Sequence, residues 1–214
     1  MSIVKNMFKG YREKDFQFDM HIEHLEWEDS GITALRGPSG SGKSTFFRLL
    51  LGLEPCPGME WWLNEKNLAD LPVAQRQLGV VFQTYELFPH MTARQNILFA
   101  GKARGQNAKA TEARMLELSD QLEIRENLDQ SAQNLSGGQK QRVALIRAMV
   151  APIQYLFLDE PFSALDSDLR DSARKMVGEL VEREKIPTLL VTHDEQDVQA
   201  LAHRELKIEN GRIL

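Results

Sequence analysis

The sequence predicts an α/β fold, and three segments carry this prediction. In each of them, a short apolar run with strand character leads through a loop into a helical pattern. The apolar runs are 32–35, 155–158 and 187–191, and the helical patterns after them start near 43, 166 and 195. Alternation of strands and helices along a chain is typical of an α/β core.

Composition and charge restrict the class of protein. The 214 residues suffice for one large domain or two small ones, and a net charge of −5 gives no support for nucleic-acid binding. The single cysteine, Cys56, cannot form an internal disulfide, so we expect a reducing, cytoplasmic setting. No apolar run approaches the ~20 residues that span a bilayer, and basic residues interrupt 1–14, which is therefore not a signal peptide. We expect any association with a membrane to be peripheral.

The N-terminal part of the chain predicts a small antiparallel sheet. Residues 2–27 contain two runs with strand character, and polar and apolar side chains alternate cleanly over 15–22. A turn cluster at 54–58 precedes a further strand at 60–63.

The middle of the chain changes from mixed to helical character. Pro72 suits the first turn of a short helix through Gln77, and 78–82 is a buried strand that ends at Gln83. The pattern from about 92 to 122 is helical, with Thr92 as a suitable N-cap. Three residues divide it into two helices: Gly101, Gly105 and Asn107. A third helix is predicted from Ser136 to Met149, so that a helical insertion lies between strands of the core.

The C-terminal part returns to strands and helices in turn. A long helix is predicted over 166–185 and a shorter one over 195–203. The chain closes with a strand at 205–208, a hairpin turn at Asn210 and Gly211, and a last short strand.

The loop between the first apolar strand and its helix fits the phosphate-binding pattern G-x-x-x-x-G-K-[ST]. Its residues are Gly37, Pro38, Ser39, Gly40, Ser41, Gly42, Lys43, Ser44 and Thr45. Glycines let backbone N–H groups turn toward a phosphate chain, and the helix that follows adds the positive end of its dipole. Lys43 supplies a cation for the β- and γ-phosphates, and the Ser44 hydroxyl can ligate Mg²⁺. Strand, glycine loop and helix together predict a P-loop that binds a nucleotide.

Two carboxylates follow the apolar strand 155–158. Asp159 is placed at the carboxyl end of the strand, where ligands bind in open α/β sheets, and it can hold Mg²⁺. Glu160 is then positioned to polarise an attacking water as a general base. The alternative is a strand that simply ends in a polar turn, and the P-loop favours the catalytic interpretation.

The most specific segment is Leu-Ser-Gly-Gly-Gln at 135–139. Ser136 is a good N-cap, and Gly137 and Gly138 free the N–H groups of the first helical turn to approach an anion. Each of these glycines costs the helix about 1 kcal/mol relative to alanine, which indicates a functional reason for them. The alternative is an ordinary capped helix after a loop.

These segments, in this order, resemble the nucleotide-binding subunit of ATP-binding cassette (ABC) transporters over essentially the whole chain. The resemblance implies a P-loop NTPase (RecA-like) core with an N-terminal antiparallel β-subdomain and an inserted helical subdomain. It divides the single domain, 1–214, into a nucleotide-binding core at 1–83 and 142–214 and a helical signature subdomain at 84–141. ATP and Mg²⁺ are the cofactors that it implies.

Residue roles follow from the same resemblance. Gln83 corresponds to a loop glutamine that contacts Mg²⁺ and senses the nucleotide, and His193 to a switch histidine near the γ-phosphate. Ser136 and Gly138, within a segment that includes Gly137 and Gln139, correspond to signature residues that bind the γ-phosphate held by an opposite subunit. Asp166 corresponds to an aspartate at the dimer contact. Each has an alternative, since Gln83 can cap a strand, Asp166 can be a helix N-cap and His193 can be a hydrogen-bonded residue at a strand end.

An aromatic side chain near the N-terminus is expected to stack on adenine. The resemblance places Tyr11 at this position, and stacking contributes about 1–3 kcal/mol per base. Three other aromatic residues can replace it if the strand register differs: Phe8, Phe16 and Phe18.

The importer branch of the family is indicated by the segments 159–166 and 87–92. The first resembles importers of oxyanions, polyamines, ferric iron, thiamine and sugars, and the second resembles the groove for a permease coupling helix. The implied partners are a second copy of the chain around two ATP, permease subunits docking near Phe88 to Thr92, and a solute-binding protein, on the cytoplasmic face of the membrane. Many such importers continue into a regulatory β-domain, whereas this sequence ends at Leu214, so we expect no regulation through such a domain and a form closer to thiamine-type short subunits. The alternatives are an exporter or non-transport ABC ATPase, a P-loop phosphotransferase, and a catalytically silent regulatory module.

Overall fold

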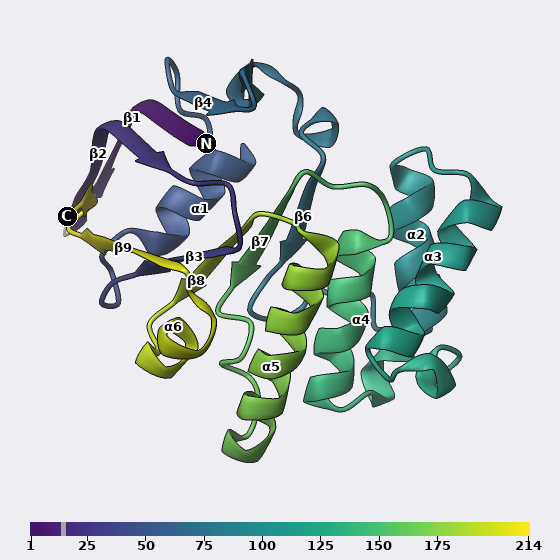
Figure 1. The fold of residues 1–214 in the computed structure, drawn as a ribbon. Coiled ribbons are helices and arrows are strands. Elements are labelled where there is room, and N and C mark those ends of the chain that lie inside the picture. The colour runs from purple at the N-terminus through teal and green to yellow at the C-terminus, as the bar shows by residue number, and fades with distance from the viewer. Residues whose placement is uncertain (14–15) are drawn as a thin grey trace.

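The computed structural model describes residues 1–13 and 16–214, which form two sheets and the helices around them (Figure 1). A four-stranded antiparallel sheet has the order β2-β1-β4-β5, and a six-stranded sheet has the order β10-β9-β3-β8-β7-β6. The strands of the first sheet are β1 (Ser2–Glu13), β2 (Phe16–Trp27), β4 (Glu60–Leu63) and β5 (Lys66–Asn67). Those of the second are β3 (Ile32–Arg36), β6 (Leu78–Val81), β7 (Tyr155–Asp159), β8 (Thr188–Thr192), β9 (Arg204–Glu209) and β10 (Arg212–Ile213).

Six α-helices are present in the described part of the chain. They are α1 (Lys43–Leu51), α2 (Ala93–Ala103), α3 (Ala108–Gln121), α4 (Gly137–Met149), α5 (Ser167–Glu184) and α6 (Glu195–Leu201). Single 3₁₀ turns lie at Leu68–Asp70, Val73–Gln75, Arg125–Asn127 and Ala132–Asn134. None of these helices combines the length and the apolar character needed to cross a bilayer.

The six-stranded sheet is covered on both faces, and alternate side chains of its strands show this directly. Tyr155 and Phe157 of β7 pack with α1 and the antiparallel sheet. Leu156 and Leu158, which point the opposite way, pack with α2, α3, α4 and α5. Strands buried on both faces have no polar alternation, which is why 155–158 is a continuous apolar run. The predicted α/β fold, with its antiparallel sheet and helical insertion, is confirmed.

The two sheets are joined around α1 by a buried polar contact. The indole Nε1 of Trp27, at the end of β2, donates a hydrogen bond of 2.8 Å to the hydroxyl of Tyr155 at the start of β7. Both side chains are almost completely buried, and the contact joins residues 128 positions apart in the sequence.

Three local predictions need correction. The region after Pro72 is a single 3₁₀ turn, Val73–Gln75, rather than a helix to Gln77. Gly101 lies inside α2 rather than between helices, and a Cβ there would lie 2.3 Å from Cγ2 of Thr111, so glycine permits the close approach of α3. The last helix ends at Leu201, because 204–209 forms β9.

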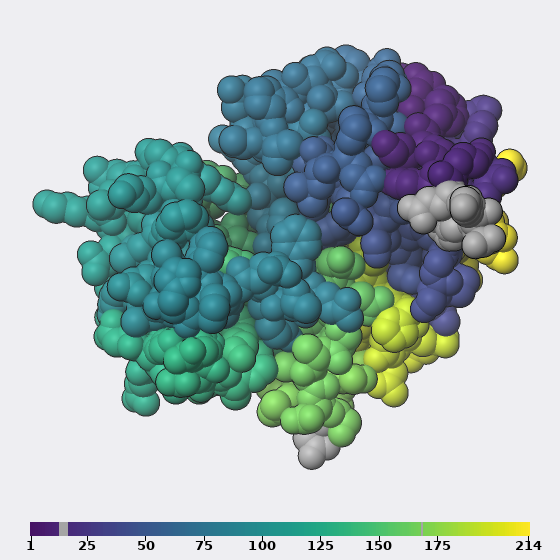
Figure 2. Space-filling view, turned by 180° about the vertical axis from the view of Figure 1, so that it is seen from behind, coloured from purple at the N-terminus to yellow at the C-terminus, as the bar shows by residue number. Residues whose placement is uncertain are grey.

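Two further predictions concern the strand pattern over 15–22 and the subdomain boundaries. The alternation predicted over 15–22 begins at Asp15, which lies outside the described residues, and is seen from residue 17 onward in β2. The subdomain boundaries near 84 and 141 stay a prediction, because one hydrophobic cluster runs from the helices α2 to α4 onto the sheet. Seen from behind, the teal surface of α2 and α3 lies on the opposite side of the molecule from the purple surface of β1 (Figure 2).

Candidate functional site

The loop 37–42 joins β3 to α1 and is shaped by its glycines. Gly40 and Gly42 have φ values of +79° and +107°, which side chains with a Cβ rarely adopt. A Cβ on Gly37 would lie 2.2 Å from the carbonyl oxygen of Ile208, so a larger residue does not fit there either. Lys43 is only 9% exposed, and its ammonium donates to the carbonyl oxygens of Gly37 (2.8 Å) and Pro38 (3.0 Å). The cation is thus held inside the loop whose N–H groups surround the phosphate position.

The remaining loop residues differ in exposure. Pro38, Ser39, Gly40 and Ser44 are exposed, Gly42 and Thr45 are half-buried, and Ser41 is buried. The Ser41 hydroxyl has no hydrogen-bond partner among the described atoms, while its N–H donates to the carbonyl of Pro38 over 3.2 Å. Exposure of Ser44 at the N-terminus of α1 is what a hydroxyl ligand to a bound cation requires.

Four neighbouring strands deliver the predicted catalytic residues to one edge of the sheet. The order β3-β8-β7-β6 is parallel throughout, so the carboxyl ends of these strands lie side by side. The residues that follow these ends are the P-loop after β3, His193 after β8, Glu160 after β7 and Gln83 two residues after β6. Asp159 is the last residue of β7. Ligands of open α/β sheets bind at such an edge.

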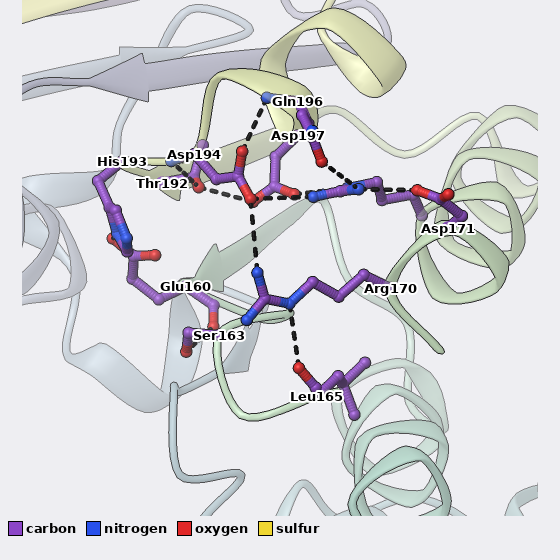
Figure 3. A network of polar contacts seen from close by, with 11 residues as sticks. Glu160, Ser163, Leu165, Arg170, Asp171, Thr192, His193, Asp194, Gln196 and Asp197 are labelled. Carbon is purple, nitrogen blue, oxygen red and sulfur yellow. Dashed lines mark hydrogen bonds and ion pairs between the residues drawn. The ribbon is translucent and has the colours of Figure 1, made fainter. Parts of the chain in front are cut away.

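Glu160 and His193 contact each other across this edge (Figure 3). Nδ1 of His193 lies 2.7 Å from Oε1 of Glu160, and the Glu160 N–H donates to the carbonyl of Val191 at 2.9 Å. Glu160 has a φ of 47°, in the left-handed region that non-glycine residues seldom occupy. Such backbone strain is found at functional sites more often than elsewhere.

The charges at this edge shift one another. Burial, and then the nearby Glu160 carboxylate, raise the pKa of Asp159 to about 6, while Lys43 acts in the opposite direction. Burial lowers the pKa of Lys43, and the carboxylates of Glu160 and Asp159 partly counteract this. Two carboxylates against one ammonium leave an excess of negative charge, which a divalent cation would neutralise.

The oxygen atoms at this sheet edge suit Mg²⁺, which keeps part of its water shell. They suit less well a cation that is coordinated by protein side chains alone. No cluster of three or more His, Cys, Asp or Glu side chains suited to a metal occurs in residues 1–13 and 16–214. Mg²⁺ typically uses one or two protein oxygens and completes its shell with water and phosphate. Ser44, Asp159 and Gln83 offer a hydroxyl, a carboxylate and an amide oxygen at the edge described above.

A cavity of about 270 Å³ adjoins the P-loop on the side of the antiparallel sheet. It is lined by Tyr11, Phe18, Gly40, Gly42, Lys43, Ser44, Thr45, Arg48 and Glu54. The Tyr11 hydroxyl donates to the Glu54 carboxylate, and burial, followed by this contact, raises the pKa of Tyr11 to about 12. The Phe18 ring lies close to Gly42, while Phe8 packs against His21 with tilted rings whose centroids are 4.7 Å apart and does not line the cavity.

The structure therefore retains two aromatic residues that could stack on the adenine base. It also places two polar residues in the lining of the cavity. Tyr11 and Phe18 both face the P-loop cavity, and the side chain of Phe16 lies outside the described residues. Arg48 and Glu54, which form an ion pair of 3.0 Å, were not predicted from the sequence. Arg48 is four residues after Ser44 and so on the same face of α1, a spacing that was available in the sequence.

The segment 135–139 begins α4 and lies apart from the P-loop cavity, which none of its residues line. Ser136 caps the helix: its hydroxyl accepts from the Gln139 N–H at 3.3 Å, and the Gln139 side chain accepts from the Ser136 N–H at 2.9 Å. A Cβ on Gly138 would meet nothing within 4 Å. One on Gly137 would make ordinary contacts with Cδ2 of Leu165 at 3.4 Å and with the carbonyl oxygen of Ala164 at 3.6 Å. The glycines are therefore not required by packing within the chain.

Asp166 and Gln83 are exposed side chains beside these elements. Asp166 occupies the N-cap position of α5, but its side chain makes no capping hydrogen bond, which weakens the purely structural alternative. Gln83 precedes a turn in which Tyr85 and Glu86 both have positive φ, and the Arg147 guanidinium of α4 donates to both of their carbonyls. The turn that follows Gln83 is thereby tied to α4, the helix that starts with the segment 135–139.

A P-loop at one sheet edge, a carboxylate–histidine pair beside it and an exposed glycine-rich helix start define the class of ATP-binding cassettes. Comparison with known proteins agrees: the ABC transporter family model matches residues 22–163, and the chain belongs to the ABC transporter family.

Two curated relatives show where the chain is most similar. It is 38% identical over 191 residues to a probable sulfate/thiosulfate import ATP-binding protein from Chlorella vulgaris, covering 89% of this chain and 81% of that protein. It is also 38% identical over 194 residues to an sn-glycerol-3-phosphate import ATP-binding protein from Ralstonia nicotianae, covering 91% of this chain and 53% of that protein. Several other relatives are longer, and the chain spans between 53% and 60% of their length.

Solved structures show the same fold. The chain superposes on a dimeric bacterial ABC transporter cassette, MJ0796, with a TM-score of 0.81 and 25% identity, covering 100% of this chain and 96% of that one. A post-hydrolysis state of the same cassette with bound ADP and Pi gives the same values.

Proposed function

We propose that this chain is the ATP-hydrolysing subunit of an ABC importer and powers the passage of a small solute through separate permease subunits. The observation that carries the proposal is the pairing of Glu160 and His193 beside the P-loop, at the carboxyl ends of adjacent strands. The relatives from Chlorella vulgaris and Ralstonia nicotianae are import ATP-binding proteins, which supports this direction of transport.

Each residue at the sheet edge has a part in this function. The P-loop N–H groups and Lys43 would bind the β- and γ-phosphates, and Tyr11 or Phe18 would stack on the base. Ser44, Asp159 and Gln83 would hold Mg²⁺, which supplies charge neutralisation on the phosphates when bound. Glu160 would accept a proton from the attacking water, and His193 would orient Glu160 and contact the γ-phosphate.

The second half of the site would come from another copy of the chain. Within one chain Ser136 and Gly137 are exposed and Gly138 and Gln139 are half-buried, and none of them lines the P-loop cavity. They can therefore contact a nucleotide held by another copy. In the proposed head-to-tail dimer, Ser136, Gly137, Gly138 and Gln139 close the γ-phosphate from the open side, and Asp166 lies at the contact. Dimeric cassettes among the solved relatives support this arrangement.

A permease partner is proposed at the surface around 88–92. Phe88 and Phe99 are 36% and 48% exposed, and their rings pack edge-to-face with centroids 5.1 Å apart. Exposed aromatic pairs of this kind are enriched in protein interfaces. The proposal includes a position on the cytoplasmic face of the membrane and a solute-binding protein on the other side.

The proposal is tested by ATP hydrolysis and by co-purification. We expect steady Mg²⁺-dependent hydrolysis by the full chain, lost in Lys43→Ala, and recovery of a multi-span membrane protein when the tagged chain is purified from detergent-solubilised cells. Hydrolysis without such a membrane partner would favour a non-transport ATPase. Phosphate transfer to a small molecule in place of hydrolysis would show a phosphotransferase, and binding without turnover a silent module.

A further inference from the structure

A buried arginine on α5 joins three carboxylates next to the candidate site. Arg174 is 4% exposed. Its Nε lies 2.7 Å from Asp197, its Nη1 2.8 Å from Asp171 and its Nη2 3.0 Å from Asp194. Figure 3 shows the three carboxylates gathered from α5 and from the start of α6.

This network fixes the residues on both sides of His193. The Thr192 hydroxyl donates to Oδ2 of Asp197 over 2.7 Å, and the Asp194 N–H donates to the same hydroxyl over 3.0 Å. Asp194 also caps α6, since its Oδ1 accepts from the Gln196 N–H at 2.8 Å. The His193 side chain is itself 62% exposed, so its direction depends on a backbone that Arg174 holds through Asp194 and Asp197.

A second arginine, Arg170, connects the Asp194 carboxylate to the segment before Asp166. Nη1 of Arg170 lies 3.8 Å from Oδ2 of Asp194, and its Nε donates to the carbonyl of Leu165 at 3.0 Å. Asp194 is thus shared between the fixed Arg174 and the half-buried Arg170. Through Arg170, the residue after His193 is linked to the turn that leads into Asp166 (Figure 3).

Stability alone is a weak explanation for this arrangement. Removing charged groups from water costs free energy that their attraction often fails to return, and apolar residues of similar size can fill the same space. A hydrogen-bonded guanidinium instead restricts its partners to one geometry, since its donors lie in a rigid plane. A requirement for a fixed direction at His193 accounts for the buried charges.

We propose that Arg174 is a positioning residue for His193, and that Asp194 and Arg170 make the His193 loop and the 163–166 turn move together. The inference rests on the proposed function, because it assigns His193 a part in ATP turnover. In the proposed dimer, the arrival of the partner at Asp166 would then be transmitted to His193 through Leu165, Arg170 and Asp194.

The first test reads the imidazole of His193 directly and needs no turnover. In an NMR spectrum of the histidine rings of the full chain, the His193 signal is assigned by its loss in His193→Gln. We expect Arg174→Met and Asp194→Asn to shift this signal and to leave that of His90 unchanged. Arg114→Met is the matched control, because Arg114 is also paired with two carboxylates, Glu117 and Glu184, but lies on α3.

The second test uses kinetics. Misplacement of a catalytic group by about 1 Å lowers turnover as much as 100-fold, so we expect Arg174→Met to lower kcat about 10-fold or more. The Kd for ATP should stay within about twofold, and Arg174→Lys should recover part of kcat. In a His193→Ala background, Arg174→Met should add little further loss, because both changes act on the same group.

The two tests separate the inference from the proposed function. An absence of ATP hydrolysis by the wild-type chain would overturn the proposed function, while the NMR test still decides the positioning of His193. If Arg174→Met fails to fold, Asp194→Asn and Arg174→Lys carry both tests. The inference would be overturned if the His193 signal did not move in the folded variants. It would also be overturned if Arg174→Met lowered kcat as much in the His193→Ala background as in the wild type.

Discussion

Nδ1 of His193 and Oε1 of Glu160 lie 2.7 Å apart, although the residues are 33 positions apart and follow different strands. An ionised carboxylate only accepts hydrogen bonds, so with an ionised Glu160 the donor of this contact is Nδ1. The pairing then sets both the tautomer of the histidine and the direction of the carboxylate. It also places Glu160 beside the P-loop, where a general base for water attack on a γ-phosphate is needed.

The aromatic cavity beside the P-loop leads to a prediction on nucleotide affinity. Tyr11→Ala should weaken ATP binding by a factor of about 5 to 150, which corresponds to the loss of about 1–3 kcal/mol of stacking. Isothermal titration with ATP and with inorganic triphosphate measures this, since only ATP carries a base. Phe8→Ala is the control, because Phe8 packs on His21 outside the cavity. If Phe18→Ala weakened ATP binding by this factor and Tyr11→Ala did not, the adenine base would stack on Phe18, and the prediction for Tyr11 would be wrong.

The raised pKa of Asp159 leads to a prediction on stability against pH. An acid whose folded-state pKa lies above its unfolded value binds extra protons when folded, so its ionisation destabilises the fold as the pH rises. For Asp159 this window runs from 3.8 to about 6. Asp159→Asn should therefore raise the melting temperature of the nucleotide-free chain more at pH 7.5 than at pH 5.

The control for this prediction is Asp129, whose pKa is lowered in the folded protein whereas that of Asp159 is raised. Arg94 hydrogen-bonds to Asp129 and lowers its pKa, so Asp129→Asn should, if anything, lower the melting temperature above pH 4. Thermal scans of both variants and the wild type at the two pH values make the comparison. An equal gain from Asp159→Asn at pH 5 and pH 7.5 would show that ionisation of Asp159 does not destabilise the fold.

The contact between Trp27 and Tyr155 leads to a prediction on folding. Tyr155→Phe leaves the buried indole N–H of Trp27 without a partner, which costs about 1–3 kcal/mol. The double variant Trp27→Phe/Tyr155→Phe removes both partners, so it should recover the part of the loss that comes from the unpaired donor. Urea unfolding followed by circular dichroism gives the unfolding free energies of the wild type, Tyr155→Phe, Trp27→Phe and the double variant. A double variant that loses the sum of the two single losses would mean that the hydrogen bond contributes nothing.

The fold and the catalytic edge follow from local patterns. Apolar runs such as 155–158 end in polar residues, and the parallel order of their strands brings Asp159, Glu160 and His193 to one edge. Ser136 and Thr92 were predictable as N-caps because capping depends on neighbours within one turn.

Other features depend on contacts between distant residues, which no local pattern encodes. Whether Tyr11 or Phe18 reaches the P-loop depends on the register of β1 on β2 and on where that hairpin lies against α1. Gly101 looked like a helix break, because its contact with Thr111 exists only when α3 packs on α2. Arg174 meets Asp197 from 23 residues away, and its function appears only when α5 and α6 are placed together.

The most direct test of the two-copy site is the mass of Glu160→Gln with ATP and Mg²⁺, measured by size-exclusion chromatography with light scattering. Without its general base this variant should bind ATP and not hydrolyse it, so we expect its mass to rise from 24.4 kDa to about twice that value. Adding Gly138→Asp should abolish the rise without loss of ATP binding, because a side chain at Gly138 meets nothing in its own chain but would face the partner's nucleotide. A Glu160→Gln chain that stays at 24.4 kDa with saturating ATP, or that still doubles with Gly138→Asp, would contradict the account.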